Sequence, residues 1–176
     1  VGQAIELGQA GVTHAWKTVE RGFKDPAVEV RSATINGLSI IPQSLKGAAE
    51  RLLEDSSYAI IQTALTKLAW SFPSDRTSYV SKVRTVRGPH ERVRIARLEL
   101  EAADGSTAAV RELSDLCGPG WEFITRQNAM GAMKRLAVLP ADAARNILSA
   151  LWSTNTRLSG TAGSTLAALA EQPKVR

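Results

Sequence analysis

A segment of about fourteen residues recurs in this chain at intervals of about thirty, and this periodicity constrains the fold more than any other feature. Within each copy, apolar or small residues return at steps of three and four, which is the spacing of a helix face and not of a strand. The segments superimpose when the following residues, spaced 30, 33 and 32 apart, are aligned: Arg31, Ile61, Arg94 and Arg126. Each copy is therefore predicted to be one helix of a repeated unit.

Further helical stretches lie between these copies. Several of them open with Pro, Ser or Asp, which are common at helix starts because proline's missing N–H costs nothing in the first turn. The tail from residue 155 to 172 would supply a final helix, with Gly160 and Gly163 disfavouring its first half. The second helices of the repeated units are predicted over residues 43–54, 73–86, 104–117 and 140–152.

Together these stretches predict an all-α protein. Aromatic residues make up only 5% of the chain, and its abundant Ala and Leu suit packed helices better than a sheet. A helix pair cannot bury its apolar face alone, so neighbouring pairs are expected to stack. We predict a HEAT-like α-α superhelix, a short α-solenoid of about five helix pairs that begins near Gln3. It would form a single domain over residues 1–176, and because the chain begins with Val it is expected to be a fragment of a larger protein.

Acidic and basic side chains also recur at the repeat spacing. Asp25 and Asp55 stand at equivalent positions before two predicted helices, where a carboxylate can accept free N–H groups and meet the positive end of the helix dipole, so they are predicted to cap these helices. Arg31, Arg94 and Arg126 occupy one position in three of the four copies, which predicts a ladder between adjacent helices. An Asp–Arg pair could instead bind a carboxylate or a phosphate. We favour the structural interpretation, because a stacking device would recur at the repeat spacing.

Positive charge is concentrated in one segment, residues 82–97. It holds six basic residues and one acidic residue, so it accounts for the whole net charge of +5. Some of these charges are expected to be solvated without a partner, and the alternative for this segment is a contact with an anion or an acidic partner. A local patch is weaker support for nucleic-acid binding than a basic face along the whole molecule, and a nucleic-acid partner is not expected. The candidate contact residues are Arg84, Arg87, Arg92 and Arg97.

One short motif suggests metal chemistry. The stretch HERVR, residues 90–94, approaches the H-E-x-x-H pattern in which two histidines on one helix face bind zinc. Arg94 stands where the second histidine belongs, and a guanidinium has no lone pair to give a metal. The other histidine, His14, is remote in sequence, so the similarity is attributed to chance. Cys117 is expected to be a buried residue at a helix end, because a helix C-terminus disfavours the thiolate that a nucleophile requires.

The tryptophans could serve a binding function or a packing function. They could stack on bases or sugars, but large side chains more often fill gaps between helices. Gap filling is therefore the prediction for Trp16, Trp70, Trp121 and Trp152.

Two quoted stretches resemble a known family. FKDPAVEVRSATINGL and LLEDSSYAIIQTALTKLA are similar to the C-terminal helical region of bacterial zinc aminopeptidases related to aminopeptidase N. The likeness extends from about Phe23 to Leu136. In that family the zinc site and the exopeptidase motif lie in an upstream catalytic domain. Here Arg94 replaces the second His, Leu113 stands at the later ligand position, and Gly-x-Met-Glu-Asn is absent.

The resemblance implies an accessory domain. We expect a non-catalytic C-terminal helical repeat domain that caps or restricts the active site of a zinc aminopeptidase. Its partner would be the upstream catalytic domain of the same chain, with a peptide substrate at the concave face. No catalytic residue, metal ligand or cofactor is expected in this chain, and zinc is expected in the upstream domain.

Two alternatives of other classes stay open. The first is a free-standing HEAT-repeat module for protein–protein interaction. The second is a basic HEAT-like DNA-binding protein, similar to the HEAT-like DNA glycosylases. This alternative requires basic residues spread along the concave surface. A membrane partner is not expected, since no segment approaches the roughly 20 apolar residues of a membrane span. The sequence does not indicate a compartment.

Overall fold

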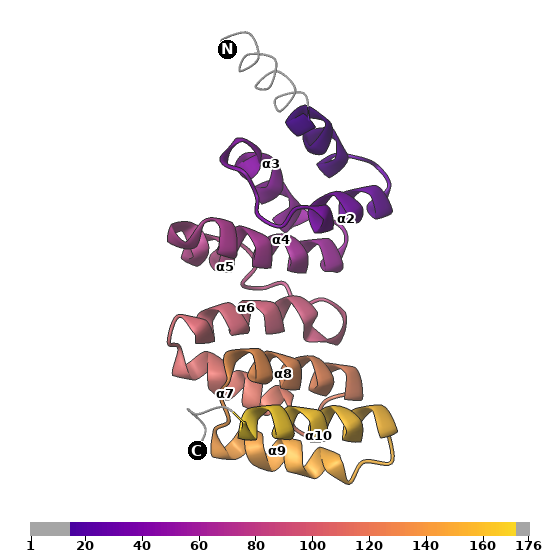
Figure 1. The fold of residues 1–176 in the computed structure, drawn as a ribbon, viewed down its shortest axis with the longest axis vertical. Helices are drawn as coiled ribbons and strands as arrows, with labels where there is room; N and C mark the ends of the chain where they lie inside the picture. Colours follow the sequence, from indigo (N-terminus) through magenta and orange to yellow (C-terminus); the bar gives the residue numbers. More distant parts are fainter. Residues whose placement is uncertain (1–14, 172–176) are drawn as a thin grey trace. The chain divides into compact units, whose positions relative to one another are not determined.

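The computed structural model describes residues 15–171, which form helices joined by short turns, with no strand in that range (Figure 1). The predicted all-α class is therefore confirmed for the described residues. The chain divides into two compact units, Val1–Lys82 and Val83–Arg176, called here unit 1 and unit 2. The arrangement as one HEAT-like array over residues 1–176 stays a prediction. Its expected start near Gln3 lies outside the described residues. No helix in the described part is long and apolar enough to cross a bilayer.

Unit 1 is organised around one central helix. This helix, α4 (Tyr58–Ser71), packs against the others of the unit and buries residues at three- and four-residue steps, among them Ile61, Leu65 and Leu68. The remaining helical elements of unit 1 are a helix over residues 15–23, α2 (Val28–Gly37), η1 (Gln43–Leu45), α3 (Lys46–Glu50), η2 (Arg51–Glu54), η3 (Pro73–Asp75) and α5 (Arg76–Lys82).

Two predicted helices of unit 1 are shorter than the sequence suggests. The stretch 43–54 keeps one five-residue α-helix, α3, between two 3₁₀ turns, the tight form that helix ends often take. The stretch 73–86 ends its helix at Lys82. Beyond it the chain turns, and the carbonyl of Arg87 accepts the N–H of Val93 at 2.9 Å. That reversal requires the chain to leave the helical path before residue 86.

Unit 2 contains two layers of helices. In one layer α6 packs against α8 and α8 against α10, while in the other α7 packs against α9 (Figure 1). Each helix thus lies beside the helix two positions further along the chain, the order that stacked helix pairs produce. The elements are η4 (Pro89–Glu91), α6 (Arg92–Ala103), α7 (Thr107–Leu116), α8 (Phe123–Leu136), α9 (Ala141–Leu151) and α10 (Thr156–Ala170).

The core of unit 2 lies between these layers. It combines large aliphatic residues such as Leu98 and Leu113 with Met130 and Met133, all fully buried, and with several alanines that let helices approach closely. Trp121 packs against this core. Trp16 is half-buried, whereas the other two tryptophans, Trp70 and Trp152, are 73% and 89% exposed. The prediction that all tryptophans fill gaps is therefore wrong for these two.

The last helix continues through both of its glycines. Asn155 Oδ1 accepts the N–H groups of Arg157 and Leu158 at 3.1 and 3.2 Å, which caps α10. Ala162 and Leu169 then pack into the core of the unit. This cap and the burial outweigh the roughly 1 kcal/mol that each glycine costs a helix.

Cys117 follows α7 and is fully buried. Burial raises the pKa of its thiol to about 12, although the nearby Arg126 guanidinium opposes this shift. The thiolate is the reactive form, so the folded protein should not react with iodoacetamide at about pH 8, while the unfolded protein should react fully. Mass spectrometry before and after denaturation measures this, and rapid labelling of the folded chain would contradict the buried placement.

Candidate functional site

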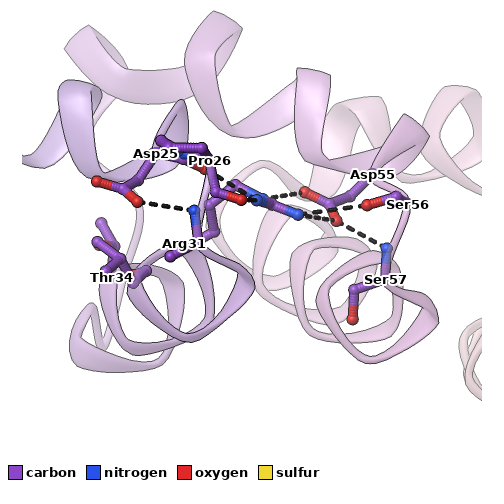
Figure 2. Close-up of polar contacts among 9 residues, drawn as sticks. Asp25, Pro26, Arg31, Thr34, Asp55, Ser56 and Ser57 are labelled. Carbon is purple, nitrogen blue, oxygen red and sulfur yellow. Dashed lines mark hydrogen bonds and ion pairs between the residues drawn. The ribbon is translucent and has the colours of Figure 1, made fainter.

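Arg31 joins the starts of two helices in unit 1. Its Nε donates to Asp55 Oδ2 at 2.7 Å and its Nη2 to Asp55 Oδ1 at 2.9 Å, a two-bonded ion pair (Figure 2). Its Nη1 donates to the carbonyls of Asp25 and Pro26 at 2.8 and 3.0 Å. The guanidinium therefore links the segment before α2 to the segment before α4.

Asp25 and Asp55 have the same local structure. Asp25 Oδ1 accepts the N–H of Ala27 at 2.9 Å, and Asp55 Oδ1 accepts the N–H of Ser57 at 2.8 Å (Figure 2). In each case the helix begins at the residue after this donor. The carboxylates thus form a turn just before the helix. Neither bonds to an N–H inside the first helical turn, so the prediction that they cap these helices is wrong.

The Arg31–Asp55 pair is largely shielded from solvent, with side chains 12% and 6% exposed. Burial of Asp55 disfavours its charge, but the hydrogen bonds from Arg31 and the Ser57 N–H outweigh burial and hold its pKa below the ordinary value. Both oxygens of the Asp55 carboxylate are engaged. The pair connects helices, and its geometry leaves Asp55 no free oxygen with which to act as a base.

Arg94 has different partners, all in unit 2. Its Nη1 donates to Glu91 Oε2 at 3.1 Å and its Nη2 to Glu112 Oε2 at 2.9 Å. Its guanidinium lies over the Trp121 ring, 5.8 Å from the centroid. Arg94 therefore links the turn before α6 to α7 within one helix pair.

Arg126 is 8% exposed and pairs with no carboxylate in the described part of the chain. Its Nε donates to the Cys117 carbonyl at 2.9 Å. Its Nη2 donates to the Asn146 carbonyl and to Ser149 Oγ, both at 3.3 Å. Arg126 thereby joins the end of α7 to α9. Asn146 and Ser149 gave no signal in the sequence, because they follow no repeat position.

The HERVR stretch does not present a zinc-binding helix face. His90 and Glu91 both have φ of 55° and lie in the turn before α6. His90 Nδ1 contacts the Glu122 carboxylate, and Glu91 pairs with Arg94. Within residues 15–171 no group of three His, Cys, Asp or Glu side chains is placed to hold a metal ion.

A cavity of about 330 Å³ lies in unit 2 beside the predicted basic contact. The turn after α5 supplies three of its residues, α6 supplies two at one-turn spacing, and α7 supplies one. We call it the arginine pocket. It is lined by Arg84, Thr85, Arg87, Arg94, Arg97 and Glu112.

The pocket differs from the predicted contact in two ways. Arg84, Arg87 and Arg97 are brought together as one lining, but Arg92 does not belong to it. Arg94, which the sequence assigned to a structural ladder, lines the cavity and is also paired with Glu112. Only the folding of α7 against α6 places Glu112 there.

Comparison with known proteins adds no relative. No family model, curated protein or solved structure matches the chain. The resemblance to the aminopeptidase region therefore rests on the two quoted segments.

Asp55→Asn tests the pair before α4. At neutral pH it should lower the free energy of unfolding by about 1–3 kcal/mol, because the Arg31 guanidinium loses its charged partner. Since the pKa of Asp55 is depressed in the folded state, its contribution is present above the ordinary value of 3.8 and fades as pH falls through the folded value. The deficit of the variant should therefore shrink in acid.

Urea unfolding followed by circular dichroism across this pH range measures the effect. Asp75→Asn is the matched control in the same unit, because Asp75 is 39% exposed and pairs with Lys46 at the surface. An equal deficit for Asp55→Asn at every pH would contradict an ionised Asp55 as the stabilising species.

Arg126→Ala tests the buried guanidinium. It should cost about 2–4 kcal/mol of stability, since the Cys117 and Asn146 carbonyls lose their charged donor and a buried space is left. The control is Arg145→Ala in the same unit, whose side chain is 78% exposed and whose loss should cost less than about 0.5 kcal/mol. Similar unfolding curves for both variants would argue against Arg126 as the link between α7 and α9.

Proposed function

We propose that this chain is a non-catalytic accessory module of a zinc aminopeptidase, built from short HEAT-like helix pairs. It acts by contact: it packs against the catalytic domain of the same protein and limits the access of peptides to the active site. The single observation that carries the proposal is the Arg31–Asp55 pair. Both side chains are engaged in linking two helix starts, which supports a structural use of this Asp–Arg combination.

Repetition of local structure supports a tandem design. Asp25 and Asp55 each form the same turn, and each turn ends at the residue just before a helix. The layers of unit 2, with α6, α8 and α10 in one and α7 and α9 in the other, are also what stacked pairs would give. Both observations agree with the family of the resembling segments, in which such helices follow the catalytic domain.

A free-standing interaction module is the second candidate, and an exposed apolar patch favours it. Leu148 and Leu151 lie one turn apart on α9 and Trp152 directly follows the helix, and these side chains are 50%, 36% and 89% exposed. Large apolar side chains grouped in this way are typical of a surface that contacts another protein.

The coding sequence upstream of Val1 separates the two candidates. The accessory-module proposal expects a zinc peptidase domain there, with H-E-x-x-H and a later glutamate ligand. The purified 176-residue chain should then bind no stoichiometric zinc and hydrolyse no aminoacyl-anilide. Zinc in the pure chain, or such hydrolysis, would contradict the proposal.

The gating role is tested in the full-length protein by deleting residues 15–171. Zinc content and hydrolysis of a small aminoacyl-anilide should persist, because both belong to the catalytic domain. The kcat/KM for long peptides should rise, since their access is no longer limited. Unchanged activity toward long peptides with intact zinc would remove the gating role.

A further inference from the structure

The arginine pocket of unit 2 holds guanidinium groups that the protein itself does not neutralise. Arg97 is paired with both carboxylate oxygens of Glu101 at 2.7 Å, and Arg94 with Glu91 and Glu112. Among residues 15–171 the only ion-pair partner of Arg87 is Glu91, at 4.0 Å, the outer limit of an ion pair, and the Arg87 side chain is 66% exposed. Arg84 has no hydrogen-bond or ion-pair partner among residues 15–171 and is exposed.

The inner wall also has unused donor capacity. The Arg97 side chain is only 11% exposed, and its Nε is buried without a hydrogen-bond partner within the described residues. Buried donors are normally paired, so an unpaired one calls for an explanation. A guanidinium carries five N–H groups in a fixed fork, and Arg97 spends one nitrogen on Glu101.

Backbone hydrogen bonds before α6 fix the turn that carries Arg87. The Arg87 carbonyl accepts the N–H groups of Val93 and Arg94 at 2.9 and 3.4 Å, which fixes Arg87 beside the start of α6. In the turn that makes these hydrogen bonds, His90 and Glu91 adopt the left-handed conformation, which is strained for residues other than glycine. The arginines of the turn and those of α6 therefore line one cavity, and the fold keeps the strained turn that brings them together.

We propose that the arginine pocket binds the phosphate group of a phosphate monoester. Arg84 and Arg87 supply the two charges that no carboxylate fully neutralises, and a phosphate monoester carries about −1.5 to −2 at neutral pH. Its three terminal oxygens can accept from several guanidinium forks at once, whereas one carboxylate offers two oxygens. The cavity, at about 330 Å³, also leaves room for a small organic group attached to the phosphate. This site does not depend on the accessory role proposed above.

A free metabolite-sized molecule and a phosphorylated side chain of a peptide both present this group. Inorganic phosphate is the first probe, added to the isotope-labelled chain at constant ionic strength, because salt screens surface charge. Amide signals of the turn 84–88 and of α6 should shift and saturate. Free phosphoserine and a phosphoserine peptide are the next probes, and tighter binding of the peptide would identify a protein source.

Single-charge variants separate a built site from diffuse attraction. Arg84→Ala and Arg87→Ala should each weaken phosphate binding, and the double variant should weaken it at least about tenfold. Both side chains are exposed, so the fold should be unaffected, which circular dichroism checks. Arg92→Ala is the matched control: it removes the same charge from the same segment but lies outside the lining.

Three outcomes would overturn the proposal. The first is no saturable binding of inorganic phosphate at about 10 mM. The second is an equal loss of affinity in Arg92→Ala and in Arg84→Ala. The third is binding of acetate as tight as that of phosphate, which would make the pocket a general anion contact.

Discussion

Within each unit the structure depends on one constraint: helices bury their apolar faces against neighbouring helices, in several cases the helix two positions further along the chain. In unit 1 α2 lies against α4, and in unit 2 α6 lies against α8 and α8 against α10. A helix pair of this length cannot shield its own apolar stripe, so its stability comes from the neighbouring pair. Polar groups at the helix ends must then be satisfied where helices meet, and the arginines do this.

The three arginines at the repeat position show how one location can serve different junctions. Arg31 bonds a carboxylate before α4, Arg94 bonds carboxylates on both sides of its own helix pair, and Arg126 bonds carbonyl groups. The long side chain and its forked donors make this variation possible, because a guanidinium accepts any oxygen within reach. A common position therefore does not imply a common partner.

The same adaptability explains how a residue that links helices also lines the arginine pocket. Arg94 is paired with Glu91 and Glu112. It also lines the cavity together with Arg84, Arg87 and Arg97. The turn before α6 brings these lining residues together and contains two residues other than glycine that have positive φ. Function in this chain is thus proposed where the backbone departs from the regular repeat, while the regular positions maintain the fold.

The sequence by itself determined the helical class and the period of about thirty residues, because both follow from local spacing. It placed Asp25 and Asp55 before two helices but predicted helix caps, whereas each carboxylate accepts the N–H two residues on and forms a turn ahead of the helix. It placed helix ends less well: residues 83–86 left their predicted helix to close a turn, and α10 continued through two glycines because tertiary burial outweighed propensity. Only the tertiary structure decided that Arg92 stays outside the pocket, that Glu112 enters it, and that Asn146 meets Arg126. These contacts join residues remote in sequence, and no periodic pattern carries information about such pairs.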